Sequence, residues 1–263
     1  MQIAGIGRFI FWDGGSLWIG LAAAAGDRHA HHAIQLSLGL SGAVQFRPDA
    51  SSPWTRYAAA VIPSDLPHVF QAPGNQVAQI FVEPESTTGG KLLQRFGTDA
   101  IAALDEDEAR RLAAPLAAQY NDGADDETLA ATATQTLARL AGDAGPLQRT
   151  TDARIVAAIE EIWCRLDEPL TLAEIARVAG LSEGRLRHLF VEQTGVPFRA
   201  YVLWARLNRA LGLGYTGTSW TEAAHAANFA DSAHLTRTCR RMFGLAPTAL
   251  RLDHTLQSSR MLA

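Results

Sequence analysis

The feature that most constrains the fold of this chain is a pattern of capped helices that occurs twice, roughly fifty residues apart. The first copy contains GLSEGRLRHLF over residues 180–190, and the second contains NFADSAHLTRTC over residues 228–239. Each copy opens with a residue that tolerates the left-handed conformation, Gly180 or Asn228, and soon reaches an N-capping side chain, Ser182 or Asp231. We therefore predict that one helix ends and another begins at each of these turns.

A short helix is predicted to precede each turn. Thr171 with Glu174, and Ser219 with Glu222, match the capping box, in which two side chains satisfy free backbone N–H groups at a helix start. Apolar residues follow at the i, i+3, i+4, i+7 spacing of one helix face. They are Leu172, Ile175, Ala176 and Ala179 in the first copy, and Trp220, Ala223, Ala224 and Ala227 in the second. Each copy thus predicts a helix-turn-helix, whose second helix fits the major groove of B-DNA.

The second helix of each copy is predicted to bury its apolar residues and to expose a polar face. The residues expected inside are Leu186, Leu189, Phe190, Leu235 and Cys239. The residues expected to contact DNA are Ser182, Glu183, Gly184, Arg185, Arg187, His188, Ser232, Ala233, His234, Thr236, Arg237 and Arg240. Arg187 and Arg237 are the first choices, because an arginine fork fits guanine O6 and N7. A helix over residues 198–213 is expected to join the copies and to set the reading helices about 34 Å apart, one turn of DNA.

The charge of the chain is distributed unevenly. The formal net charge is −4, and residues 1–150 contain 10 basic and 16 acidic side chains. Between Arg177 and Arg251, in contrast, there are 10 arginines and 4 acidic residues. Lys91 is the only lysine of the chain, and arginine is the cation best suited to phosphate and guanine. The asymmetry indicates a polyanionic partner for the C-terminal part.

The C-terminal hundred residues resemble the DNA-binding domain of the AraC-type transcriptional regulators. The resemblance rests on LTLAEIARVAGLSEGRLRHLFVEQTGVPFRAYVLWARLNRAL and on the tail FGLAPTALR, in which Phe243, Gly244, Pro247 and Arg251 match the most specific family pattern. The chain departs from that pattern at a few positions. They are Asn228 in place of glycine, Cys239 in place of phenylalanine, Gly184 at a base-contacting position, and Gly212 and Gly214 at the end of the joining helix.

The resemblance implies a sequence-specific DNA-binding transcription regulator and not an enzyme. Double-stranded DNA is the implied partner, and a small effector in the N-terminal domain is the implied control. A homodimer and a contact with RNA polymerase are further implied partners. The alternative is a metal-dependent cupin enzyme that carries an accessory DNA-binding tail.

We expect an α+β chain of three parts. Residues 1–86 are predicted to form a cupin-like antiparallel β-barrel that serves as a sensor, with strands near 17–21, 34–40, 58–62 and 77–82. Residues 87–148 are predicted to form a helical hairpin that covers the barrel or mediates dimerisation, followed by a linker over residues 142–146. Residues 149–255 are predicted to form the all-α tandem helix-turn-helix domain.

Histidines of the N-terminal part form a second group of interest. His29 and His31 alternate along a predicted strand and so point to one side of a sheet, and His68 follows in a Pro-x-His sequence. This arrangement resembles a degenerate cupin pattern in which Gln35 occupies the place of the glutamate ligand. Three interpretations stay open: internal hydrogen bonding, an effector pocket that includes Trp18, or a metal site at His29, His31 and His68. The regulator interpretation requires no cofactor.

The sequence also indicates a cytoplasmic protein. No apolar run approaches the roughly 18–20 residues of a membrane span, and the N-terminus lacks the features of a secretory signal. The two cysteines, Cys164 and Cys239, are expected to be reduced and buried.

Overall fold

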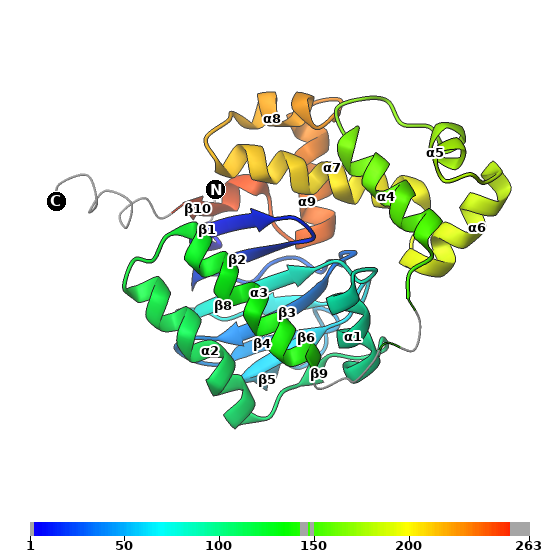
Figure 1. The fold of residues 1–263 in the computed structure, drawn as a ribbon. Coiled ribbons are helices and arrows are strands. Elements are labelled where there is room, and N and C mark those ends of the chain that lie inside the picture. The colour runs from blue at the N-terminus through cyan, green and yellow to red at the C-terminus, as the bar shows by residue number, and fades with distance from the viewer. Residues whose placement is uncertain (1–2, 143–146, 148–149, 253–263) are drawn as a thin grey trace.

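The computed structural model describes residues 3–142, 147 and 150–252. Its N-terminal part contains two sheets, of seven strands in the order β10-β1-β2-β8-β3-β6-β9 and of three strands in the order β5-β4-β7 (Figure 1). The strands are β1 (Gly5–Trp12), β2 (Gly15–Ala22), β3 (Ile34–Gly39), β4 (Val44–Arg47), β5 (Thr55–Tyr57), β6 (Ala59–Ile62), β7 (Val69–Gln71), β8 (Gln76–Val82), β9 (Ala102–Ala103) and β10 (Leu250–Leu252). The four strands predicted from the sequence correspond to β2, β3, β6 and β8.

A tight turn begins the large sheet. Gly14 has φ of 79°, a conformation that favours glycine, and it joins β1 to β2 so that Gly15 pairs with Trp12. The central strands β2, β8 and β3 are antiparallel to their neighbours and are buried along most of their length. They are buried because helices pack on one face of the sheet and the small sheet packs on the other.

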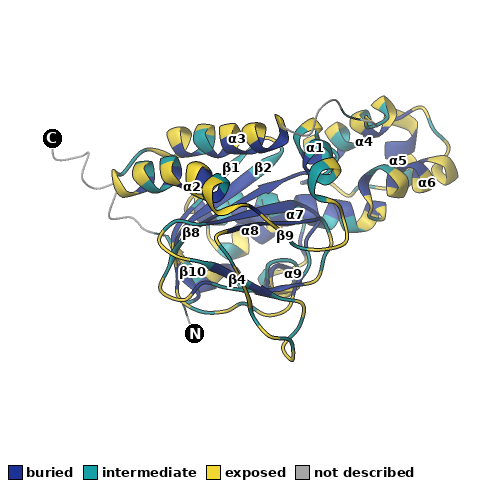
Figure 2. Ribbon diagram, turned by 90° about the horizontal axis from the view of Figure 1, so that it is seen from below, coloured by how far each residue is buried: buried dark blue, intermediate teal, exposed yellow. Residues whose placement is uncertain are grey.

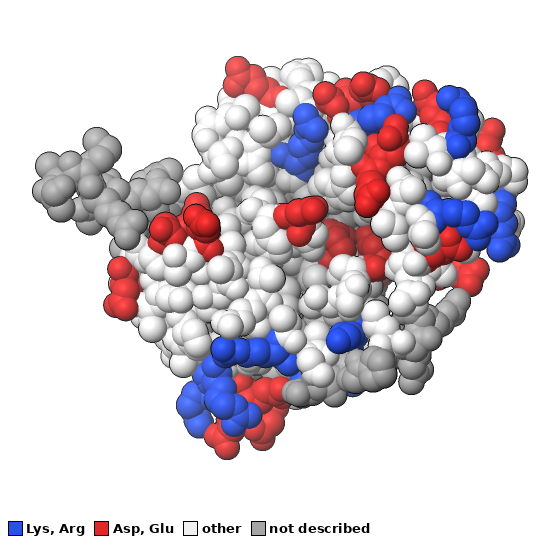
Figure 3. Space-filling model, in the orientation of Figure 1, with Lys and Arg blue, Asp and Glu red and all other residues white. Residues whose placement is uncertain are grey.

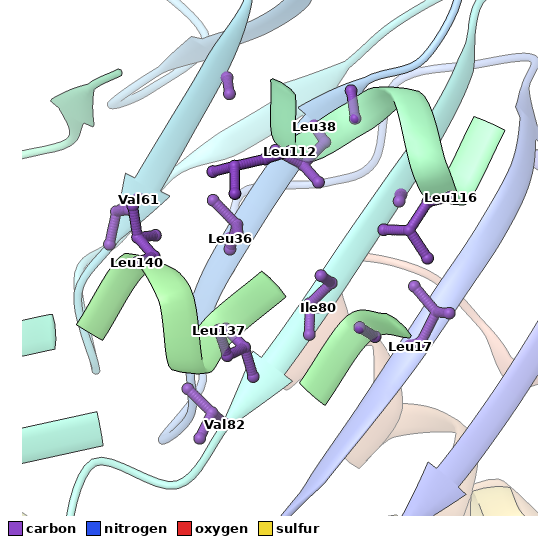
Figure 4. Packing of buried hydrophobic residues seen from close by; sticks show 14 of the residues in the cluster. Leu17, Leu36, Leu38, Val61, Ile80, Val82, Leu112, Leu116, Leu137 and Leu140 are labelled. Atoms are coloured by element: carbon purple, nitrogen blue, oxygen red, sulfur yellow. The ribbon is translucent and has the colours of Figure 1, made fainter. Parts of the chain in front are cut away.

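Three helices cover one face of the large sheet. They are α1 (Thr87–Phe96), α2 (Glu106–Asn121) and α3 (Asp126–Gly142). Figure 4 shows the apolar sides of α2 and α3 lying against the strands, with Leu112 over β3, Leu116 near Leu17 of β2, and Leu137 near Val82 of β8. The predicted hairpin therefore exists and covers the sheet, while its outer side faces solvent (Figure 2).

The small sheet packs against the other face of the large sheet. A second core forms between them, in which Trp18 and Ile62 of the large sheet meet Phe46 of the small one. The predicted cupin-like barrel is thus built as two packed sheets, antiparallel except for the pairing of β10 with β1, and no ladder among the described residues joins them into one closed ring.

The C-terminal part contains six α-helices among the described residues. They are α4 (Ala153–Cys164), α5 (Leu172–Val178), α6 (Glu183–Thr194), α7 (Phe198–Tyr215), α8 (Trp220–Ala226) and α9 (Ser232–Phe243). One apolar cluster holds α4, α5, α6 and the start of α7 together, and another holds the end of α7 to α8 and α9. The helix α7 belongs to both clusters and connects the two halves directly.

The joining helix α7 is regular to its end despite its two glycines. Gly212 and Gly214 lie near its C-terminal end, and the helix continues past both of them to Tyr215. A Cβ at Gly214 would lie 2.1 Å from the ring of Trp220. Glycine at this position therefore permits the close approach of α8 to α7.

The last described strand was not anticipated in a domain expected to be all-α. After the short 3-10 helix η1 (Pro247–Ala249), β10 pairs in parallel with β1, so that Gly5 lies opposite Leu250 and Gly7 opposite Leu252. The C-terminal domain thereby adds a strand to the N-terminal sheet.

Three smaller expectations have different outcomes. Cys239 is buried as expected, but Cys164 at the end of α4 is exposed, and both are free thiols. Most of the linker predicted at 142–146 lies outside the described residues. Across the described part of the chain, no helix combines the length and the apolar character that a membrane span needs.

Candidate nucleic-acid interface

The first helix-turn-helix has the predicted local structure. The side chains of Thr171 and Glu174 form the capping box at the start of α5, and Gly180 has φ of 64° in the turn. Ser182 then accepts a hydrogen bond from the backbone N–H of Arg185 and begins α6. The two helices are thus fixed by their own caps as well as by the core beneath them.

The second helix-turn-helix repeats this construction. Ser219 and Glu222 form the capping box of α8, and Asn228 takes the left-handed conformation with φ of 57°. The carboxylate of Asp231 accepts a hydrogen bond from the N–H of His234 at 2.6 Å and begins α9. Asparagine replaces the usual glycine here at low cost, because its short polar side chain tolerates this region.

The two second helices bury one side and expose the other (Figure 2). The residues predicted to lie inside are all buried. Of the predicted DNA contacts, three are half-buried, namely Ser232, His234 and Thr236, and the ring of His234 packs against Phe229. The others are exposed: Ser182, Glu183, Gly184, Arg185, Arg187, His188, Ala233, Arg237 and Arg240.

The exposed arginines differ in their partners. Within the described residues, no hydrogen bond or ion pair engages the guanidinium of Arg187, Arg237 or Arg240. By contrast, the guanidinium of Arg206 on α7 donates to the backbone oxygen of Glu168 at 2.8 Å, and Arg209 lies 4.0 Å from Asp167. Arg187, Arg237 and Arg240 are therefore available to bind an anion, whereas Arg206 and Arg209 of α7 contact the protein.

The charge on the visible surface is mixed rather than uniformly positive. Figure 3 shows basic side chains over the α5–α6 end of the molecule, with acidic groups among them. Any attraction to DNA must come from the local arrangement of arginines on the reading helices, and it must fall as salt screens it.

The end of α9 is docked on the N-terminal domain. The ring of Phe243 lies 5.5 Å from that of Phe81 and 6.0 Å from that of His31. The backbone N–H of Asp27 donates to the oxygen of Gly244 at 2.8 Å. The helices α5 and α6, in contrast, project to one side, away from the sheets (Figure 1). The N-terminal domain therefore contacts the second reading helix more directly than the first.

Polar groups are buried where α7 meets the N-terminal domain. The indole N–H of Trp204 donates to Glu83 at 2.9 Å, and the hydroxyl of Tyr201 donates to Glu85 at 2.6 Å. His32 Nε2 lies 3.0 Å from the carboxylate of Glu85. Burial and the neighbouring charge of Glu85 raise the pKa of Glu83 to about 8. Burial lowers the pKa of His32, but the hydrogen bond to Glu85 and the charges of Glu85 and Glu83 together outweigh burial, so this pKa is raised overall.

The three predicted histidines of the N-terminal domain meet in space. Their backbones approach through a bridge between His29 and His68, and the ring centroids of His29 and His68 are 4.3 Å apart. Gln35 Oε1 lies 2.8 Å from His31 Nε2. Trp18 forms no hydrogen bond with the three imidazole rings. Together with His29 and Gln35, it lines a cavity of about 50 Å³.

A larger cavity lies between the two domains and was not predicted. Its volume is about 280 Å³, and its lining includes Trp12, Trp163, Trp204 and Arg209. No local sequence pattern could indicate this cavity, because its walls come from β1, α4 and α7, which are distant along the chain. Trp54 lies outside it and stacks with Arg47 at the surface.

Comparison with known proteins agrees with this geometry. Residues 175–253 match the model of a helix-turn-helix domain family. The chain is 33% identical over 170 residues to the transcriptional activator NphR of a Rhodococcus species, over 64% of this chain and 48% of NphR. It is 26% identical over 231 residues to the transcriptional regulator LumQ of Photobacterium leiognathi, over 84% of this chain and 90% of LumQ. This chain thus spans about half the length of NphR.

The whole fold is similar to that of ToxT from Vibrio cholerae. The TM-score is 0.56 at 13% identity, and the match covers 89% of this chain and 95% of ToxT. ToxT has also been solved with an unsaturated fatty acid bound.

Two exposed, capped second helices joined by the helix α7 define the C-terminal part as a tandem helix-turn-helix domain. Residues 175–253 thus carry a domain of the helix-turn-helix family, and the chain is similar to proteins named as transcriptional regulators.

Proposed function

We propose that the protein is a sequence-specific DNA-binding transcription regulator, in which α6 and α9 read base edges in neighbouring major grooves. The observation that carries the proposal is the pair of helices whose outer faces expose Arg187 and Arg237 without a protein partner in the described structure. Such arginines can each hold a guanine through two hydrogen bonds. The similarity to NphR and LumQ supports regulation of transcription.

The test begins with DNA fragments selected by the purified protein from a random pool. Binding of the selected site is then measured at two salt concentrations for the wild type, Arg187→Ala and Arg237→Ala. Each variant is expected to lose about 1 to 3 kcal/mol of binding free energy and to relax its preference at one base position. Arg56→Ala, which removes an exposed arginine of β5, is the matched control and should change neither. If both reading-helix variants bind like the control, the assignment of α6 and α9 is wrong.

We further propose that a small effector controls DNA binding. Organic ligands occupy cavities of roughly 300–1,000 Å³, so the cavity of about 280 Å³ between the domains suits one better than the cavity of about 50 Å³ beside His29, Gln35 and Trp18. An effector between the domains would bear on the contact between α7 and the sheet. Three tryptophans line this cavity, so a change in tryptophan fluorescence during ligand screening is the expected sign, and its loss in Arg209→Gln would support the location.

Two protein partners and a location are also proposed, because they are expected of a transcription regulator. A homodimer through the exposed side of the α2–α3 hairpin and a contact with RNA polymerase beside the promoter are proposed, as is a cytoplasmic location. Sedimentation of the wild type and of Ala118→Glu, which places a charge on the outer side of α2, tests the dimer. A dimer that persists unchanged in the variant would exclude this surface.

A further inference from the structure

We propose that His29, His31 and His68 form a binding site for a divalent first-row transition metal such as Zn²⁺, with Gln35 as a neighbouring oxygen ligand. One ring nitrogen from each histidine lies within 4.8 Å of the others, and all three residues are buried. Imidazole nitrogens suit Zn²⁺, Fe²⁺, Ni²⁺ and Cu²⁺.

The hydrogen bonds of the rings fix which nitrogen is free. Nδ1 of His29 lies 2.9 Å from the backbone oxygen of Asp27, and those of His31 and His68 lie 2.8 Å from the oxygens of Ala33 and Leu66. A carbonyl oxygen can only accept, so each Nδ1 carries the hydrogen. Each Nε2 is therefore left with a lone pair. This is the arrangement found around metal-bound histidines, in which the second nitrogen is held by a backbone carbonyl or carboxylate.

No hydrogen-bond donor among the described residues faces the Nε2 atoms of His68 and His31. His68 Nε2 is buried and has no hydrogen-bond partner among the described residues. His31 Nε2 faces Gln35 Oε1 at 2.8 Å, while the amide nitrogen of Gln35 donates to Ser37 at 2.7 Å. Two acceptors at this distance repel each other unless a cation lies beside them or the amide turns over.

Protonation is an unfavourable way to fill the cluster. All three histidines are buried, and burial disfavours the charged imidazolium form. A metal ion supplies the missing electrophile to several lone pairs at once, since ligand distances of about 2.1 Å bring neighbouring donors to about 3 Å from each other. The cavity of about 50 Å³ beside His29 and Gln35 leaves room for a further small ligand such as water.

The second cluster of possible ligands is occupied by the protein. His32, Glu83 and Glu85 also lie within 4.8 Å of one another. Their polar atoms already bond to one another, to Tyr201 and to Trp204. This cluster of His32, Glu83 and Glu85 therefore forms a hydrogen-bonded bridge between the two domains. In the test below it is the alternative metal-binding site.

The proposed metal site lies directly under the end of the second reading helix. A Cβ on Gly244 would be 2.6 Å from His29 Nδ1, and the ring of Phe243 packs against that of His31. Drawing the imidazoles together around a metal must therefore move or tighten this contact. On this account, which here rests on the proposed function, metal occupancy changes the affinity for DNA.

The test measures metal binding without DNA. The full chain is stripped with a chelator and titrated with Co²⁺ and with Zn²⁺, following the visible spectrum of Co²⁺ and the bound metal by elemental analysis. One equivalent of metal is expected. His68→Gln should weaken binding about 100-fold, while His225→Gln, which changes an exposed histidine of α8, should leave it unchanged.

A second variant with an expected gain in metal affinity tests the site even if His68→Gln fails to fold. Gln35→Glu places a carboxylate beside the three nitrogens, so it should tighten metal binding about tenfold or more and should lower the thermal stability of the metal-free protein. The proposed site would be wrong if His68→Gln and Gln35→Glu both bound metal with wild-type affinity. It would also be wrong if only Glu85→Gln lost the equivalent of bound metal. Metal binding with unchanged DNA affinity would preserve the site and overturn its coupling to DNA.

Discussion

At the scale of single residues, the glycines are of two kinds. At some positions a side chain would clash with a neighbouring residue, and at others there is open space for one. Gly214 faces the ring of Trp220, whereas a Cβ at Gly184 on the outer side of α6 would have no atom within 4 Å. The sequence marked both as departures from the family pattern, but it could not distinguish them. The difference depends on a contact between α7 and α8 that only the folded chain makes.

This difference predicts opposite effects of one substitution. Gly184→Ala should raise the free energy of unfolding by about 0.5 to 1 kcal/mol, because alanine lowers the entropy lost on forming a helix. Gly214→Ala should lower it by about 1 to 3 kcal/mol through overpacking against Trp220. Denaturant unfolding of the two variants checks both, and equal effects would contradict the close contact.

The buried histidines predict how stability depends on pH. The pKa of His29 is about 4 in the folded chain and 6.5 when unperturbed, so between these values the unfolded chain binds more protons. Stability must therefore fall as pH decreases through this window. Glu83, whose pKa is raised to about 8, acts in the opposite direction, so the contribution of His29 has to be measured as a difference.

For metal-free protein, the fall in unfolding free energy from pH 7 to pH 5 should be smaller in His29→Gln than in the wild type by about 2 kcal/mol. Denaturant titrations at the two pH values, with a chelator present, provide this comparison. An identical fall in both proteins would mean that His29 is protonated in the folded state.

At the scale of elements, the helices were predictable and several strands were not. Local caps and apolar spacing determine α5, α6, α8 and α9, and these signals lie within a few residues of each helix. The strand β10 has only three residues and depends on β1 at the opposite end of the chain. The strand β1 was also missed, because its sequence GIGRFIFW does not alternate regularly between apolar and polar residues. The outer faces of the reading helices could be predicted, but the docking of Phe243 on the sheet could not.

The strand β10 should hold the second helix-turn-helix on the sheet. Leu250 packs in clusters of both domains, so Leu250→Ala should cost about 1 to 2 kcal/mol of stability and should speed hydrogen exchange in the paired part of β1. Arg251→Ser, whose exposed side chain lies between the two leucines, should leave exchange in β1 unchanged. Unaltered exchange in Leu250→Ala would show that β10 does not anchor the domain.

At the scale of the whole molecule, the two halves of the DNA-binding domain are held differently. The second half is joined to the N-terminal domain by β10, by the end of α9 and by the stacking of Phe9 on Tyr215 at 5.1 Å. The first half projects away from the sheets, and α7, with 18 residues, connects it rigidly to the second. A signal in the N-terminal domain would therefore reach the first reading helix through α7, whose Tyr201 donates to Glu85, and through α4, whose Trp163 lines the cavity between the domains.

The most direct test of the account is the spacing of the two DNA contacts. The affinity of the protein for its selected site is compared with that for the same site carrying five or ten base pairs inserted between the half-sites. Because α7 fixes the separation of α6 and α9, both insertions should reduce the affinity to that of a DNA with a single half-site. Full affinity for the DNA with five inserted base pairs would contradict the claim that one rigid unit reads two neighbouring grooves.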